Sequence, residues 1–325
     1  LQPPSRSQNW WASVTEPERY PTAKGVEDAI KAAARRASAA DPSLTTDQRI
    51  RLEHFNRFLS RVFSEGPDSE WLLKGGTGML ARVPSTRATL DIDLYLYREG
   101  YGLDDAVADL RRLAGHELGD HFRFVYVGHR AIVGGEGQPY TDGYRVEFDT
   151  YIGAQKKARI GVDLATGAGL TAEPTVTAPA SALDLPRLVG FDYRLYPVVD
   201  QIADKVCATM HRYGDRPSSR EKDLVDLVVL AVTHDIDGTA LSMAIATETR
   251  RRRMDPIERF VVPAEWGAAY SKMARTVPYC ADVLRIDAAS DLVAALIDPA
   301  LDDTADGLTW HHAELAWSPA PASPG

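Results

Sequence analysis

Apolar and polar positions follow two different patterns along the chain. Up to residue 165, segments with helical spacing of apolar residues are mixed with short apolar runs typical of strands. Helices are expected at 24–40, from 46 up to the stop at 66–68, at 77–83 and at 103–118. Two strands are expected inside 70–97, with further strands at 122–127, 144–151 and 158–164. Beyond residue 197 the spacing is almost purely helical to about 305. We therefore expect an α/β core of the α+β type with a mixed sheet, followed by an all-helical C-terminal domain.

Changes in composition indicate where these parts begin and end. The first 21 residues mix Pro, Ser, Gln and aromatic residues without a period, and a Pro-punctuated stretch separates the two halves. The last residues are rich in Pro, Ala and Ser. We expect an N-terminal arm at 1–23, a core at 24–190, a helical domain at 191–308 and a peripheral tail at 309–325.

Composition excludes several classes of protein. The net charge of -9 argues against unspecific coating of nucleic acid, although a local basic patch could still bind RNA. Cys207 and Cys280 are too few for a disulfide framework and indicate a reducing compartment. The longest apolar runs fall well short of the roughly 18 residues that a membrane helix needs, and the first residues do not resemble a signal peptide. We expect a cytoplasmic protein without a membrane partner.

Two carboxylates follow a glycine turn in the first strand–turn–strand unit. Asp91 and Asp93 are two residues apart on a predicted strand, so both side chains point to the same face. Paired carboxylates repel each other unless a cation lies between them, and oxygen ligands of this kind suit Mg²⁺. Gly75, Gly76 and Thr77 offer close backbone approach and free amides at a helix start, which favours an anion. Together these residues predict a site for a metal and a triphosphate.

A third carboxylate belongs to a later predicted strand. Asp163 lies between Val162 and Leu164, so its side chain points away from those apolar neighbours. If this strand lies beside the one that carries Asp91 and Asp93, the three carboxylates converge and can hold two metal ions for attack on a phosphate. The alternative interpretation is an amphipathic strand with a solvated acidic face.

The helical half contributes a lysine and two further acids. Lys205 lies beside the apolar face of the helix predicted at 198–213, where a lysine usually extends to solvent. The helix after residue 220 is apolar almost all round and therefore buried, yet Asp223 and Asp226 share one stripe of it. Buried carboxylates need a cation or a donor. Lys205 is one candidate partner, and Arg220 or Lys222 of the same helix are the others.

The densest basic run is Arg250–Arg253. Basic residues near a helix end are commonly solvated, because they complement the helix dipole. In a chain of net charge -9, this run is also the natural place to hold an RNA backbone.

The motifs taken together resemble the DNA polymerase β-like nucleotidyltransferase superfamily. More narrowly, the chain is similar over residues 24–300 to the AbiEii group, which includes the MenT toxins of toxin–antitoxin systems. The stretches that carry this resemblance are Lys74–Thr77, Arg87–Leu94, Val199–Ala208, Arg220–Leu227 and Val262–Trp266.

The resemblance implies an activity and its substrates. It implies transfer of a nucleoside monophosphate from an NTP, with Mg²⁺ or Mn²⁺ bound by Asp91, Asp93 and Asp163 and with release of pyrophosphate. The implied acceptor is an RNA, most simply the 3′ end of a tRNA. The implied role is that of a toxin that blocks translation and is controlled by a cognate antitoxin.

The resemblance also implies roles for single residues. It places Lys205 and Asp223 at the active site, with Lys205 on the triphosphate and Asp223 orienting Lys205 or the nucleotide. Asp226 would be structural. Gly75, Gly76, Thr77, Arg87 and Thr89 would contact the nucleotide, with Arg87 as a phosphate clamp. Two alternatives stay open, namely a nucleotidyltransferase acting on a small molecule such as an antibiotic, and a non-catalytic NTP-binding or protein-interaction module.

Overall fold

A mixed β-sheet forms the centre of the first half of the protein. The computed structural model describes residues 19–132, 143–167, 169–211 and 220–319. Within them, the large sheet has eight strands in the order β3-β4-β6-β2-β1-β8-β7, with β5 beside β4. The strands are β1 (Trp71–Lys74), β2 (Ile92–Tyr97), β3 (Phe122–Ala131), β4 (Gly143–Ile152), β5 (Gln155–Lys156), β6 (Ile160–Gly167), β7 (Thr175–Thr177) and β8 (Tyr193–Leu195). The mixed sheet expected from the sequence is confirmed, because β2 runs parallel to β6 but antiparallel to β1.

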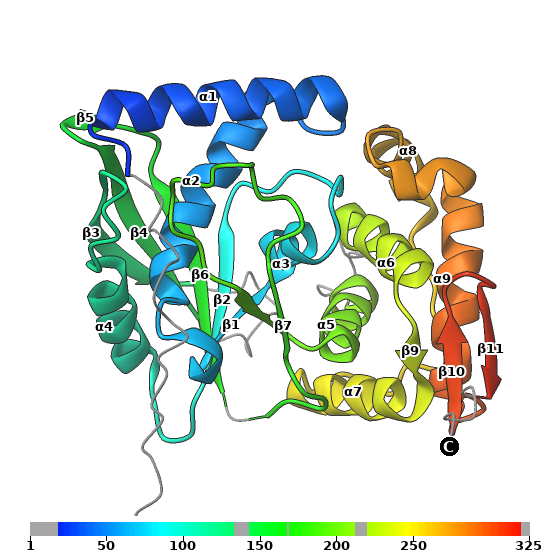
Figure 1. Cartoon of the computed structure of the whole chain (residues 1–325). Coiled ribbons are helices and arrows are strands. Elements are labelled where there is room, and N and C mark those ends of the chain that lie inside the picture. Colours follow the sequence, from blue (N-terminus) through cyan, green and yellow to red (C-terminus); the bar gives the residue numbers. More distant parts are fainter. Residues whose placement is uncertain (1–18, 133–142, 168, 212–219, 320–325) are drawn as a thin grey trace, which may run out of the picture.

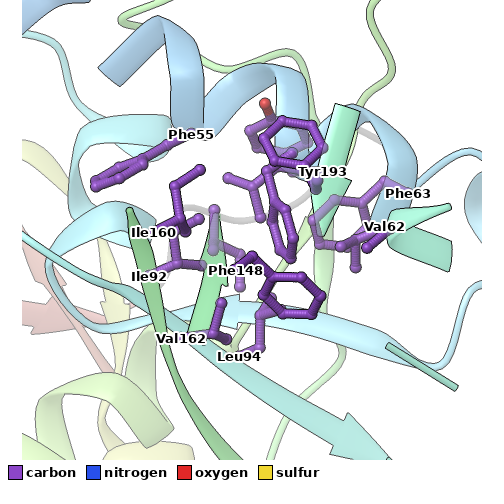
Figure 2. Packing of buried hydrophobic residues seen from close by; sticks show 14 of the residues in the cluster. Phe55, Val62, Phe63, Ile92, Leu94, Phe148, Ile160, Val162 and Tyr193 are labelled. Atoms are coloured by element: carbon purple, nitrogen blue, oxygen red, sulfur yellow. The ribbon is translucent and has the colours of Figure 1, made fainter. Parts of the chain in front are cut away.

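One face of this sheet packs on the first helices. These are α1 (Ala23–Ala40), α2 (Thr46–Val62) and α4 (Leu103–Ala114), grouped around the sheet in Figure 1. Figure 2 shows Phe55 and Val62 of α2 in one hydrophobic cluster with side chains from three strands. These are Ile92 of β2, Val162 of β6 and Phe148 of β4. Because side chains alternate along a strand, the residues between these apolar positions point to the opposite face. That opposite face carries the acids of β2 and β6.

The second half is mainly helical and packs around its own core. Its helices are α5 (Val198–Met210), α6 (Glu221–Thr233), α7 (Gly238–Arg251), α8 (Gly267–Ala274) and α9 (Ile286–Leu301). The short helix α3 (Gly75–Arg82) connects the halves, because its Met79 belongs to the helical core while its first residue follows β1 directly. Figure 1 shows α5 and α6 beside α3 and the remaining helices beyond them. Among the described residues, every helix is too short or too polar to cross a membrane.

The chain differs from the sequence-based expectation at both ends of the helical half. Strand β8 lies beyond the boundary expected at residue 190, yet it pairs with β1 of the large sheet. The segment expected to be a peripheral tail contains most of β10 (Leu308–His311) and all of β11 (Ala316–Pro319), which form a small sheet with β9 (Ile236–Asp237). Trp310 is buried there and donates its indole N–H to the carbonyl oxygen of Ala231 at 2.7 Å. Burial of this large ring anchors the segment. Residues 1–18 of the expected arm and 320–325 of the expected tail lie outside the described residues.

Candidate active site

Two carboxylates are direct neighbours in the centre of the large sheet. Asp93 of β2 and Asp163 of β6 are partners in the parallel register. Asp91 directly precedes β2, which begins at Ile92, and its carboxylate shares a hydrogen-bond donor, Arg145, with Asp163. The pairing of β2 with β6, which the sequence could only pose as a condition, thus brings the acids to one face.

A residue that the sequence did not single out lies between these acids. Arg145 of β4 is the antiparallel partner of Asp163, and its Nη1 donates to Oδ1 of Asp163 at 2.8 Å. Its Nη2 donates to the carboxylate of Asp91. Burial alone would lower the pKa of Arg145, but its bonds to Asp91 and Asp163 raise it above its ordinary value. A permanent cation therefore bridges two of the three acids.

The chemistry of this donor set fits Mg²⁺, whereas its present arrangement does not. Asp91, Asp93 and Asp163 supply the carboxylate oxygens that Mg²⁺ prefers. As the side chains stand, however, the described part of the chain contains no group of three or more His, Cys, Asp or Glu residues placed to hold a metal. The guanidinium of Arg145 occupies oxygens of two of these acids. Binding of a metal by all three would require Arg145 to move.

The glycine turn lies directly against Asp93. Lys74, the last residue of β1, pairs with Asp93 in the antiparallel register, and α3 begins at the next residue. Gly75 has a φ of +58°, and a Cβ at this position would overlap the carboxylate of Asp93. A Cβ at Gly76 would lie 2.9 Å from Oγ1 of Thr89. Glycine is required here because the start of the helix approaches the acid so closely.

Two threonine hydroxyls hold the segment that carries Asp91. Oγ1 of Thr77 donates to the backbone carbonyl oxygen of Asp91 at 2.8 Å, and Oγ1 of Thr89 donates to the same oxygen at 3.2 Å. Thr77 is buried. Both hydroxyl protons are therefore used within the protein, and the contribution expected from Thr77 to a phosphate would have to come from its backbone amide.

Burial and charge set the protonation of Asp93. Loss of contact with water raises the pKa of Asp93 from 3.8 to about 6, and Asp163 adds to the rise. Lys74, Lys205 and Lys222 act in the opposite direction and lower it. Asp93 is therefore mainly ionised at neutral pH, and cationic groups from both halves of the protein favour its ionised form.

A buried network of four charged groups lies next to this site. Nζ of Lys205, on α5, donates to Oδ1 of Asp223 at 3.0 Å and to Oδ2 of Asp226 at 2.5 Å, both on α6. Arg87, from the segment before β2, donates through Nε and Nη2 to the two oxygens of Asp226 at 2.9 and 2.7 Å. The sequence offered Lys205, Arg220 or Lys222 as partners of these acids. The structure brings Lys205 to both of them, and Arg220 also lies 3.6 Å from Asp223. The bond between Arg87 and Asp226 was not foreseen, and it engages the side chain expected to clamp a phosphate.

The charges of this network stabilise one another. Burial would lower the pKa of Lys205, but Asp226 and Asp223 raise it above its ordinary value. Burial would likewise raise the pKa of Asp226, but Lys205 and Arg87 lower it. The lysine therefore remains an ammonium ion, and two of its three protons are directed to carboxylates. The network fixes α5, α6 and the approach to β2 in one arrangement.

Further contacts connect α5 and α7 to the acids. Gln201 of α5 donates through Nε2 to the carbonyl oxygen of Gly75 at 3.3 Å. Nζ of Lys74 lies 6.0 and 5.7 Å from the ring centres of Tyr95 and Tyr196. The same two tyrosines line a pocket of about 170 Å³, whose rim includes Arg251 from the basic run. The basic run therefore contributes one residue, Arg251, to a pocket that Tyr95 of β2 also lines.

Comparison with known proteins assigns the family. The family model described as nucleotidyl transferase AbiEii toxin, type IV toxin–antitoxin system, matches residues 57–304, which is more than half of the chain. The protein is a nucleotidyltransferase and belongs to the AbiEii toxin family. The expectation drawn from its motifs is thereby confirmed. A search of curated proteins finds no match.

Two solved structures are similar to this chain. The nucleotidyltransferase toxin MenT4 from Mycobacterium tuberculosis has 16% sequence identity and a TM-score of 0.49, and the match covers 84% of this chain and 98% of MenT4. The protein JHP933 from Helicobacter pylori has 12% identity and a TM-score of 0.42, with 80% of this chain and 96% of that chain covered.

Proposed function

We propose that this enzyme transfers a nucleoside monophosphate from an NTP to the 3′ end of an RNA, that the RNA is a tRNA, and that the modification blocks translation. Transfer would depend on Mg²⁺ or Mn²⁺ and would release pyrophosphate. The observation that carries this proposal is the position of the glycine turn. Gly75 opens α3 directly against Asp93, so that a group bound at the helix start would also lie beside the acids.

Asp91, Asp93 and Asp163 would hold the metal in this proposal. When bound, Mg²⁺ would polarise the phosphoryl oxygens and offset the charge that develops on them. The three carboxylates supply the type of ligand that this ion takes. The side chains of Asp91 and Asp163 are each 38% exposed, so an ion can reach them from solvent.

The triphosphate would lie at the start of α3. Backbone amides at a helix start point to an anion, and the glycines permit its close approach. Lys74 and Lys205 act on Asp93 through their charge and would stabilise the negative charge of the leaving pyrophosphate in the same way. Asp223 would keep Lys205 in position, since it accepts a hydrogen bond from its ammonium group.

The choice of an RNA acceptor is supported by the charged residues of the pocket that Tyr95 and Tyr196 line. A small cationic acceptor would need acids without partners, and the pocket beside Tyr95 does contain Asp200 and Glu248. Asp200, however, accepts hydrogen bonds from the backbone amide of Thr171, at 3.1 Å to each oxygen. Glu248 pairs with Arg252 at 2.6 Å. Both acids therefore already have partners. Arg251 pairs with Glu248 at 3.5 Å, but its side chain is 40% exposed and can also meet a phosphate.

The proposal is tested by following the label from each of the four NTPs, in the presence of Mg²⁺ and with total tRNA as the acceptor. A parallel reaction contains an aminoglycoside in place of RNA. Incorporation into tRNA from one or more NTPs is expected with the wild-type protein. Label that appears on the small molecule and never on RNA would contradict the proposed acceptor while leaving the chemistry of transfer intact.

A further inference from the structure

Arg145 reaches the acids of the site by lying across a glycine. In the register of β4 with β6, Arg145 faces Asp163 and Glu147 faces Gly161. Ile92, the residue after Asp91, pairs with Val162, the residue after Gly161. A Cβ at Gly161 would overlap the guanidinium group of Arg145. The glycine therefore leaves the space through which the arginine extends to both Asp163 and Asp91.

This arginine occupies oxygens that a divalent ion would use. A guanidinium group does not lose its proton in a protein, so the positive charge between the two acids is permanent. The pair is nevertheless in contact with water, because the side chain of Arg145 is 22% exposed and those of Asp91 and Asp163 are 38% exposed. Ion pairs of such exposure contribute only about 0–1 kcal/mol. The guanidinium can therefore be displaced, but it must be displaced before a metal binds all three acids.

We propose that Arg145 is a built-in counter-ion that competes with a divalent metal for Asp91 and Asp163. Metal alone then binds weakly, because it has to replace a cation that is already in place. A triphosphate offers the guanidinium other oxygens to bind, so metal and NTP bind together more readily than metal alone. This inference rests on the proposed function, in that it takes these carboxylates as the metal ligands.

The test measures binding of Mn²⁺ alone, without NTP, to the purified full-length protein by electron paramagnetic resonance. Arg145→Gln is expected to bind Mn²⁺ about tenfold more tightly than the wild type, because two acids lose their internal counter-ion. Arg159→Gln is the matched control. Arg159 also pairs with carboxylates of β4, but its partners are Glu147 and Asp149 instead of Asp91 and Asp163. The affinity of Arg159→Gln for Mn²⁺ should therefore remain within about twofold of the wild type.

A second variant keeps the positive charge of Arg145 but fills the space over Gly161 through which its side chain extends. Gly161→Ala forces the guanidinium away from the acids, and the φ of Gly161 is not positive, so the backbone accepts alanine. It should also bind Mn²⁺ more tightly than the wild type. The gain of Arg145→Gln should disappear when Asp163→Asn is added, since the ion then loses a ligand.

Three outcomes would overturn the inference. They are unchanged or weaker Mn²⁺ binding in both Arg145→Gln and Gly161→Ala, no Mn²⁺ binding to any variant, and a gain that survives Asp163→Asn. The transfer assay with labelled NTPs decides separately on the proposed function. If the enzyme is active but neither Arg145→Gln nor Gly161→Ala gains affinity for Mn²⁺, only the proposed role of Arg145 is refuted.

Discussion

The ammonium nitrogen of Lys205 lies 2.5 Å from Oδ2 of Asp226, and this contact joins α5 to α6 inside the protein. The same carboxylate binds Arg87 through both of its oxygens. Asp226 thus pairs with two cations at once, although its side chain is completely buried. This one acid connects α5, α6 and the segment before β2.

Asp226→Ala should therefore be strongly destabilising. Removal of the carboxylate leaves Lys205 and Arg87 without their shared partner, and breaking a buried pair from one side costs about 3–5 kcal/mol. The free energy of unfolding, measured with urea, should fall by this amount. Glu65→Ala is the control, because Glu65 pairs with Arg112 in solvent and should cost at most about 1 kcal/mol. Equal losses in the two variants would show that the network is not a structural centre.

Lys205→Ala tests the proposed catalytic use of this network. Loss of a cation that stabilises developing charge typically lowers kcat by about 10²–10³. We expect such a loss in transfer to RNA and the loss of growth inhibition in cells, with a circular dichroism spectrum like that of the wild type. Lys156→Ala, which removes an exposed lysine bound to Asp149, should leave both unchanged. A folded Lys205→Ala variant with full activity would refute the role of this lysine.

Gly75→Ala should abolish transfer by displacing the carboxylate of Asp93. The substitution strains the backbone at a φ of +58° and also places a Cβ on the carboxylate. Gly100→Ala separates these effects, because Gly100 has a φ of +78° but no atom within 4 Å of the added Cβ. Both variants should lose about 1 kcal/mol of stability from backbone strain, whereas only Gly75→Ala should lose activity. Similar activity in the two variants would contradict a close contact between the turn and Asp93.

The raised pKa of Asp93 predicts how stability depends on pH. The folded protein holds a proton on Asp93 up to about pH 6, whereas the unfolded chain releases it near 3.8. Between these values the folded state binds more protons, so this group makes stability fall as pH rises, and the loss remains above pH 6. Asp93→Asn should remove the loss and increase stability at pH 7 by on the order of 1–3 kcal/mol.

Unfolding at pH 4 and pH 7 measures this effect. The difference in stability between Asp93→Asn and the wild type should be small at pH 4 and large at pH 7. The exposed Asp287 supplies the control, since Asp287→Asn should show the same small difference at both values. If Asp93→Asn and the wild type differed in stability by the same amount at pH 4 and pH 7, the raised pKa of Asp93 would be contradicted.

Patterns within single elements were predictable from the sequence, whereas partners across elements were not. Alternation put Asp93 on the face opposite to Ile92 and Leu94, although Asp91 lies just before the strand. An almost entirely apolar helix indicated that Asp223 and Asp226 are buried. Both rules act over a few neighbouring residues. By the same alternation, Arg145 lies on the other face of β4 from the apolar Val146, and this could have marked Arg145 as a candidate site residue. Its role depends on β4 lying beside β6, and strand order is set by the packing of the whole sheet.

The end of the chain illustrates the same limit. Its content of Pro, Ala and Ser suggested a peripheral tail, yet Trp310 packs into the helical core. Local composition does not show that a distant strand, β9, offers an edge to pair with. Burial of the ring and the pairing of β10 with β9 outweigh the weak local preference of this segment.

Asp93 and the acids beside it are proposed to catalyse the transfer of a nucleoside monophosphate. The most direct measurement compares NTPs labelled at the α-phosphate and at the γ-phosphate, with tRNA as acceptor, for the wild type and Asp93→Asn. The wild type is expected to transfer the α-label to RNA and to leave the γ-label in pyrophosphate, whereas Asp93→Asn should transfer neither. Transfer of the γ-label to RNA, or an equal transfer of the α-label by Asp93→Asn, would contradict this proposal.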